Sequence, residues 1–525
     1  MIGNTMKEII YAIFLSFFLC GLCGNAEAKK KKEVKKSIKR EVQTPYDKLF
    51  KGKKAFTVNG LMKMHLMAGK VYAEFPIELL NRDLALTSSI EDISDNGEGV
   101  VGQFAGRVNQ FRFTLQDSML QARLVRRYGV KNTGMGKNAD QIIERSNTPG
   151  IFQSYKILAY TPDKKAVVVD MTELFLESSR LTNPFPSYAG NSLYGFVQRI
   201  HKFQSQRSEL LGICGNDNSM SVHCNLGFNV DRLVLGSFMQ AKDVPVSVTV
   251  NKILMLLPED PMRPRLADSR IGVNAIIQTE LPDVCQGIKT YYITKRWRIE
   301  PVDEIRYKQG EMVDVKKPIV FYIDTLMPDS WIKYVKAGAE AWNAAFEKIG
   351  LRNVVRTELF PKDSSFDAGD IHNSVIRYAP SWMYYPQYSM HTDPRTGEIL
   401  NASVYLPANV ASYFYTSRTE ETMAVDPSVR KARLSEEQFG EMFKAKMMQA
   451  IGRCLGLTDN YAASSVYPVD SLRSASFTRK YGVVASVMDD FTCNKIAQPE
   501  DVKKGVVLVQ QNLGPYDYEV IKYLY

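Results

Sequence analysis

Side chains that bind metal ions strongly are scarce in this chain. Its 525 residues include five histidines, which are His65, His201, His223, His372 and His391. No two of them lie within four residues of each other along the chain. A pair of histidines one turn apart on a helix, the usual start of a zinc site, is therefore excluded.

One segment near the C-terminus keeps the spacing of such a site without its residues. In the pattern H-E-x-x-H-x-x-G-x-x-H, three histidines bind zinc and the glutamate activates the bound water. Gln449 and Arg453 stand at the two helical positions of that pattern, and Asp459 stands at the third ligand position. Ala450 replaces the glutamate, whereas Gly456 is in register with the glycine.

These residues do not rebuild a zinc site. Glutamine is a poor zinc ligand, and arginine stays protonated and has no lone pair to offer. Asp459 is the one plausible donor, and a single carboxylate makes neither a structural nor a catalytic zinc site. We therefore predict no catalytic residue and no bound metal at this segment.

A salt bridge between Arg453 and Asp459 is one expectation for the changed segment. Both residues stand at ligand positions of the pattern, so their side chains should lie close together. The guanidinium would then supply the charge of the missing cation and hold the turn after the helix. The alternative is that both side chains point to solvent.

A second motif and several further segments carry a resemblance to a known family. Residues 486–489 resemble the Met-turn that lies under the metal in metzincins, with Met488 as its methionine. Residues 262–268, 341–347, 393–400, 462–465 and 467–473 also look like family segments. The chain resembles secreted bacterial zinc-dependent metalloproteases, in which a metzincin-like catalytic domain follows N-terminal domains of unknown function. The resemblance covers nearly the whole chain after residue 28.

The resemblance implies a zinc protease, and the changes at the zinc pattern imply that its zinc and its activity are lost here. In metzincins a strand beside the active site aligns peptide substrates by edge pairing. The candidate strand here carries Ile399, Asn401, Ser403 and Tyr405. The alternative is an ordinary strand inside the sheet.

An α/β pattern is predicted to position these residues from about residue 317 onward. Residues 318–323, 374–378 and 402–406 are short apolar strands. A helix is expected from Asp329 or Ser330 to Gly350. The last major helix begins at the capping box of residues 435–438 and ends at Gly456.

We assign residues 317–525 to the metzincin-like domain. Family members usually continue well beyond the position of Tyr525, so we expect this domain to be C-terminally short. Residues 46–316 are predicted to be β-rich, with two subdomains, because apolar residues alternate at 71–75, 111–115, 120–124 and 244–250. The predicted fold class is α+β, with β-rich N-terminal domains followed by the metzincin-like α/β domain.

The N-terminus indicates export. Residues 1–28 have a basic residue, an apolar core and an A-x-A cleavage site, which are the features of a signal peptide. Residues 29–45 are predicted to be a solvated basic linker. No aromatic-and-basic motif accompanies it, so nucleic acid is not an expected partner, although the formal net charge is +10. We expect no transmembrane segment after signal cleavage.

Five cysteines remain after residue 28, and an odd number excludes a fully paired disulfide framework. Cys214 and Cys224 are close enough in sequence to bridge a short loop in an oxidising compartment.

Three functions remain open from the sequence. The first is a secreted or periplasmic pseudoprotease of a bacterial cell envelope, which is zinc-free and binds a peptide or a protein partner. The second is an active zinc-dependent metalloendopeptidase with non-standard ligands. The third is a structural or adhesion module of the cell envelope. Zinc content measured together with peptide turnover separates the second function from the other two.

Overall fold

The computed structural model describes residues 43–525 with several short gaps. The gaps are 126–129, 133–136, 179–180, 186–196, 235–237, 282–286, 364–365, 382 and 491–492. The predicted signal peptide, most of the basic linker and Cys285 lie outside the described residues. Residues Pro45–Tyr525 form one compact unit, and the predicted division near residue 317 stays a prediction.

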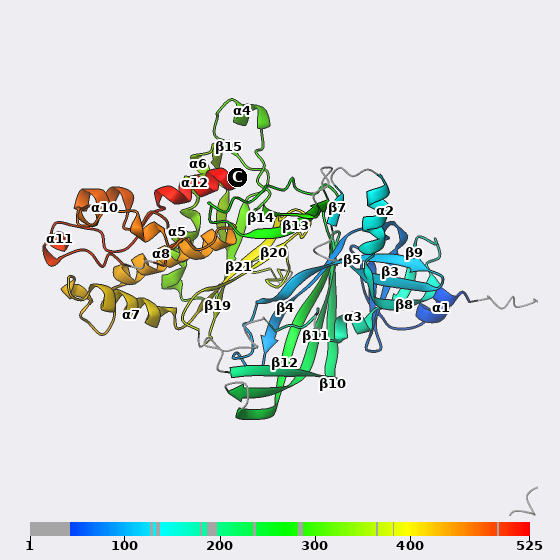
Figure 1. Cartoon of the computed structure of the whole chain (residues 1–525). Helices are drawn as coiled ribbons and strands as arrows, with labels where there is room; N and C mark the ends of the chain where they lie inside the picture. The colour runs from blue at the N-terminus through cyan, green and yellow to red at the C-terminus, as the bar shows by residue number, and fades with distance from the viewer. Residues whose placement is uncertain are drawn as a thin grey trace, which may run out of the picture. The chain divides into compact units, whose positions relative to one another are not determined.

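A large antiparallel sheet is built from residues 56–256. Its order is β1-β2-β3-β9-β8-β6-β5-β4-β12-β11-β10 (Figure 1). The strands are β1 (Phe56–Val58), β2 (Lys63–Met67), β3 (Lys70–Pro76), β4 (Leu84–Ile93), β5 (Phe104–Gln116), β6 (Met119–Leu124), β8 (Gly150–Tyr160), β9 (Ala166–Asp170), β10 (Val197–Asn216), β11 (Ser219–Val234) and β12 (Phe238–Leu256).

The alternating apolar residues place these strands as the sequence predicts. Val71, Ala73 and Phe75 lie buried on β3, and Leu120 and Ala122 lie buried on β6. Side chains alternate between the two faces of a strand, so a period of two buries one face. The predicted β-rich character of this region is therefore confirmed.

Smaller elements surround the large sheet. A three-stranded sheet has the order β14-β13-β7. Its strands are β7 (Val130–Asn132), β13 (Ala275–Leu281) and β14 (Lys289–Thr294), and the helices of this half are α1 (Pro45–Phe50), α2 (Lys137–Ser146), α3 (Thr172–Leu176) and α4 (Glu304–Lys308).

A five-stranded sheet forms the frame of the C-terminal half. Its order is β18-β16-β19-β21-β20, with β20 antiparallel to β21 and the other neighbours parallel. The strands are β16 (Ile319–Ile323), β18 (Val355–Leu359), β19 (Ser374–Ala379), β20 (Gln387–Thr392) and β21 (Ile399–Pro407), and a short parallel pair joins β15 (Val313–Asp314) to β17 (Leu351–Arg352).

Helices pack beside this sheet. They are α5 (Asp329–Glu340), α6 (Asn343–Glu347), α7 (Val410–Thr422), α8 (Glu436–Cys454), α9 (Val469–Leu472), α10 (Ala475–Tyr481), α11 (Pro499–Lys503) and α12 (Pro515–Leu524). Helix α8 contacts α5, α7, β20 and β21 (Figure 1). Its buried residues Phe443, Met447 and Ile451 join one apolar core with Val335 and Phe346. This packing fixes which face of α8 is buried.

The helix expected from residue 329 to Gly350 is two helices. Helix α5 ends at Glu340, and α6 begins at Asn343. Between them the Nε1 atom of Trp342 donates to the carbonyl oxygen of Met448 at 2.9 Å. The fully buried indole therefore anchors the break to α8.

Hydrogen bonds connect the two sheets. Ser89 on β4 donates through Oγ to the carbonyl oxygen of Gly369 at 3.1 Å. Tyr405 on β21 donates through its hydroxyl to the carbonyl oxygen of Gly102 at 3.0 Å. The molecule is an α+β protein, as predicted, and no helix within the described residues is long and apolar enough to cross a membrane.

Candidate functional site

Helix α8 presents the residues that the zinc pattern singles out. Its first turn is closed by the predicted capping box, in which Ser435 Oγ accepts from the Gln438 amide and Gln438 Oε1 accepts from the Ser435 amide. Such a cap stabilises a helix by about 1 kcal/mol. Nineteen residues then follow in one helix to Cys454.

Gln449 is buried beneath the loop that follows α10. Its Nε2 atom donates to the carbonyl oxygen of Asp489 at 2.9 Å. Its Oε1 atom is buried and has no hydrogen-bond partner among the described residues. A cavity of about 30 Å³ lies beside it, next to Met442 and Val487, which is room for one water molecule that could donate to Oε1. The hydrogen bond from Gln449 thus connects α8 to the loop that follows α10, which contains Met488.

Arg453 and Asp459 form the expected pair. Arg453 donates through Nε and Nη2 to Asp459 Oδ1, at 2.9 and 2.7 Å. The guanidinium also lies 5.7 Å from the ring centre of Tyr388 on β20. Both partners are partly exposed, at 20% for Arg453 and 33% for Asp459. The alternative in which both side chains point to solvent is excluded.

Gly456 turns the chain sharply after α8. Its φ angle is +98°, a backbone conformation that side chains with a Cβ atom rarely adopt. A Cβ atom there would also collide with the carbonyl oxygen of Lys295. The Leu457 amide donates back to the Gly452 carbonyl oxygen at 3.1 Å, which completes the helix end. Glycine is therefore required by both backbone and packing.

Met488 lies buried against α8. A Cβ atom added to Gly452 would collide with Met488 Sδ and with the ring of Trp342. Gly452 is thus what lets the helix approach this methionine closely. The Asn460 amide donates to the Met488 carbonyl oxygen at 2.9 Å, so the turn after Gly456 rests on the Met488 loop.

A buried carboxylate clamps that loop. Asp517, in the first turn of α12, accepts from Ser486 Oγ at 2.6 Å, from the Val487 amide at 2.9 Å and from the Gly514 amide at 2.7 Å. Burial raises the pKa of Asp517 to about 6, although these three donors lower it. Asp517 of α12 therefore fixes the position of the loop that contains Met488.

The strand predicted to bind peptides is an inner strand of the sheet, so that prediction is wrong. Strand β21, which carries Ile399, Asn401, Ser403 and Tyr405, pairs with β19 on one side and with β20 on the other. All four side chains are buried. The pairing with β19 covers residues 404–407, and before it the Ile399 amide donates to the Arg296 carbonyl oxygen and the Ala402 amide to Ser374 Oγ, so these backbone groups are not free to pair with a peptide. The ordinary inner strand is therefore the correct alternative.

Strand β20 is the edge strand of this sheet. Within the described residues no strand pairs with its outer side. It contacts α8, and Tyr388 is 41% exposed beside Arg453. An edge strand next to the site is the element that could pair with an extended peptide. Tyr384, Tyr385 and Tyr388 are exposed on and just before this strand, while His391 at its other end packs edge-on against Phe104 of β5.

Cys214 and Cys224 are both free, so the disulfide considered from the sequence is not formed. Cys214 lies opposite Ser221 on the neighbouring strand, and Cys224 lies three positions further along. At 3.3 Å per residue this separation is about 10 Å, beyond the reach of a disulfide.

Comparison with known families identifies the C-terminal part. Residues 431–525 match the family model described as Met-zincin. This stretch is a metzincin-like domain. It contains α8, Gly456, the Met488 loop and α12, so the predicted resemblance is confirmed for these elements of the metzincin-like domain. Residues 102–302 match a domain of unknown function (DUF5117). No curated protein and no solved structure matches the chain.

Two features of the C-terminal half were missed from the sequence. Strand β20 has a more polar sequence than its neighbour β21, which is apolar because it is buried on both faces, so the apolar pattern indicates β21 and not the edge strand. Asp517 follows Gly514 and Pro515, a proline at the start of a helix with an acid two residues later. That pattern is a helix-start signal and could have revealed its capping role.

Proposed function

We propose that this chain is a catalytically inactive relative of metzincin proteases that binds no zinc at α8 and binds extended peptides without cleaving them. The observation that carries the proposal is the salt bridge of Arg453 with Asp459, because it occupies two of the three positions at which the zinc pattern has ligands. Arginine is a cation itself, so it repels a metal ion at that place.

The site lacks the groups that catalyse peptide hydrolysis in zinc proteases. A zinc protease needs a metal that polarises the carbonyl group and a base that activates water. Ala450 offers no base, and it is 4% exposed in the core of the domain. Gln449 is committed to the Asp489 carbonyl group. The guanidinium of Arg453 could donate hydrogen bonds to a carbonyl oxygen, but it has no site at which to bind and deprotonate water.

Peptide binding is supported by the edge strand. Strand β20 runs beside α8, and its neighbour β21 fixes its register over six residue pairs. Backbone pairing would provide affinity for an extended segment, and Tyr388 with Arg453 would contact its side chains. The proposed partner is therefore a peptide or an unstructured protein segment, and the sequence of residues 1–28 supports a place outside the cytoplasm.

Peptide turnover by the chain from residue 29 onward tests the proposal. With Zn²⁺ supplied, casein and a mixed fluorogenic peptide library should remain uncut, while labelled peptides from the library should bind. Zinc-dependent cleavage that a chelator abolishes would support the active metalloendopeptidase instead. The absence of both cleavage and peptide binding would favour the structural or adhesion module.

A further inference from the structure

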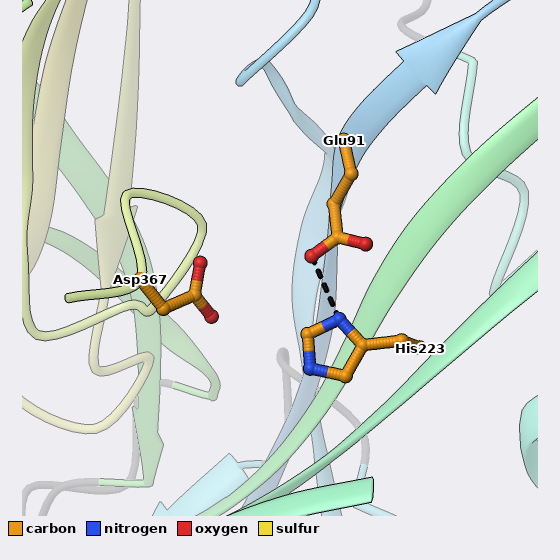
Figure 2. A group of neighbouring side chains, drawn as sticks. All are labelled: Glu91, His223 and Asp367. Atoms are coloured by element: carbon orange, nitrogen blue, oxygen red, sulfur yellow. Dashed lines mark hydrogen bonds and ion pairs between the residues drawn. The ribbon is translucent and has the colours of Figure 1, made fainter. Parts of the chain in front are cut away.

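Three potential metal ligands meet between the large sheet and the loop that follows β18. Glu91 on β4, His223 on β11 and Asp367 each place one ligand atom within 4.8 Å of the others. Figure 2 shows the imidazole of His223 bonded to Glu91 through one nitrogen, with another edge of its ring facing Asp367. Residues 91, 223 and 367 are far apart in sequence, so the fold alone brings them together.

The surrounding structure holds these side chains in place. His223 Nδ1 lies 2.8 Å from Glu91 Oε1. Asp367 accepts from the Gly369 amide at 2.7 Å through Oδ1 and from Asn251 Nδ2 at 2.9 Å through Oδ2. Asn251 is fully buried and lies opposite His223 on β12. The ligand groups are therefore preorganised by contacts that do not use their remaining lone pairs.

The cluster has unsatisfied bonding capacity and excess negative charge. His223 Nε2 is buried and has no hydrogen-bond partner among the described residues. The Oδ1 atom of Asn251, beside Asp367, is buried without a partner in the same part of the chain. Two half-buried carboxylates this close repel each other unless a cation lies between them. A protonated His223 would neutralise only one of the two charges.

We propose that Glu91, His223 and Asp367 form a binding site for a divalent cation of the zinc class. One imidazole nitrogen and two carboxylates are a ligand set that zinc accepts, whereas calcium and magnesium prefer oxygen ligands alone. Donor atoms around tetrahedral zinc lie about 3.4 Å apart, so small rotations of the side chains would bring these three into range. Water would complete the coordination.

The cation would connect the two halves of the molecule. Glu91 and His223 belong to the large sheet, while Asp367 lies in the loop between β18 and β19. The Ser89 bond to Gly369 already joins the same two parts. The proposed role is a structural brace at this junction, and it is independent of whether α8 binds zinc.

Zinc titration of the metal-stripped chain from residue 29 onward, read against a competing chromophoric chelator, tests this site. We expect one equivalent to bind, and we expect Asp367→Asn and His223→Gln each to weaken binding at least tenfold. Asp367→Asn should fold, because its amide oxygen can still accept from Gly369 while Asn251 reorients its side chain. Far-ultraviolet circular dichroism and thermal unfolding of each variant check this.

Two controls separate this site from others. His372→Gln removes a histidine that is also paired with an aspartate, Asp370, at 2.8 Å, and it should leave the affinity unchanged. Cys214→Ser removes an exposed thiol, and it should also leave the affinity unchanged. The proposal is overturned if the stripped chain binds no zinc. It is equally overturned if folded Asp367→Asn binds zinc as tightly as the original chain.

Discussion

Arg453 lies on the face of α8 where the zinc pattern has a ligand, and its guanidinium donates twice to Asp459. The sequence was sufficient to predict this pair, because the pattern itself implies that positions 453 and 459 are close in space. It was not sufficient to predict what Gln449 contacts. The Asp489 carbonyl group that holds Gln449 is 40 residues away and comes into reach only through the fold.

The Arg453 pair should contribute modestly to stability. Its arginine is 20% exposed, so Arg453→Ala should lower the free energy of unfolding by roughly 0.5–1 kcal/mol. Arg270→Ala is the matched control, because Arg270 pairs with Asp268 while 86% exposed and should cost close to nothing. Urea unfolding of both variants checks this, and equal losses would show that the Arg453 pair is only a surface contact.

Asp517 should make stability depend on pH. Its pKa is about 6 in the folded chain and about 3.9 when unfolded, so folding favours its protonated form. Its contribution is therefore fully present below about pH 4 and is lost as the pH rises through 6. The loss amounts to about 3 kcal/mol by linkage.

Asp517→Asn isolates this effect. The amide can still accept from the Val487 and Gly514 amides but does not titrate. The unfolding free energy of the original chain, minus that of Asp517→Asn, should fall between pH 4 and pH 7. A difference that stays flat, or that rises over this range, would contradict the raised pKa. Asp517→Ala should be less stable at every pH, because buried amides lose their acceptor.

At the scale of elements, local signals predicted much of the fold. The capping box at Ser435 and the glycine at 456 set both ends of α8, and alternating residues set the strands of the large sheet. Local signals did not predict the features that depend on tertiary contacts. The break between α5 and α6 depends on Trp342 reaching Met448, and the edge position of β20 depends on the strand order. Neither is visible in a short stretch of sequence.

Gly456→Ala should destabilise α8 at its end. The substitution forces a Cβ atom into a positive φ conformation and against the Lys295 carbonyl oxygen. Gly310→Ala is the matched control, because Gly310 has φ +84° but open space around its Cβ position. We expect Gly310→Ala to lower the free energy of unfolding by about 1 kcal/mol and Gly456→Ala to lower it by clearly more, as measured by chemical unfolding. Equal losses would mean that the loop simply shifts away.

The edge of β20 should carry the peptide affinity. Tyr388→Ala removes an exposed ring beside Arg453, and we expect peptide binding to weaken about tenfold, as loss of one aromatic contact does. Tyr160→Ala is the control, because Tyr160 is a similarly exposed tyrosine, at 49%, on β8 of the large sheet. Fluorescence anisotropy with a labelled peptide measures both. Equal affinities for the two variants would place peptide binding elsewhere.

At the scale of the whole molecule, the sequence predicted the order of a β-rich region and a metzincin-like domain. It could not predict the cluster of Glu91, His223 and Asp367. Each lies in a stretch with no metal-binding spacing, and only the pairing of β4, β12 and β11 and the loop after β18 bring them together. Scarce histidines exclude a local zinc motif, but they do not exclude a site assembled across the fold.

Zinc should stabilise the whole chain if the brace exists. A ligand present at one hundred times its dissociation constant adds about 2.7 kcal/mol to the free energy of unfolding. Thermal unfolding of the metal-stripped chain should therefore shift upward with Zn²⁺, and the shift should be smaller in Asp367→Asn, whose affinity for zinc we expect to be at least tenfold weaker. A shift of the same size in that variant would assign the stabilising zinc to another place.

The central claim concerns cleavage, and turnover of the peptide library with Zn²⁺ present tests it most directly. Zinc content alone does not show whether the protein is active, because the cluster around His223 would bind zinc in an inactive protein as well. We predict no cleavage above that of the Arg453→Ala variant and of buffer alone. Cleavage that requires Zn²⁺ and stops when a chelator is added would contradict the account.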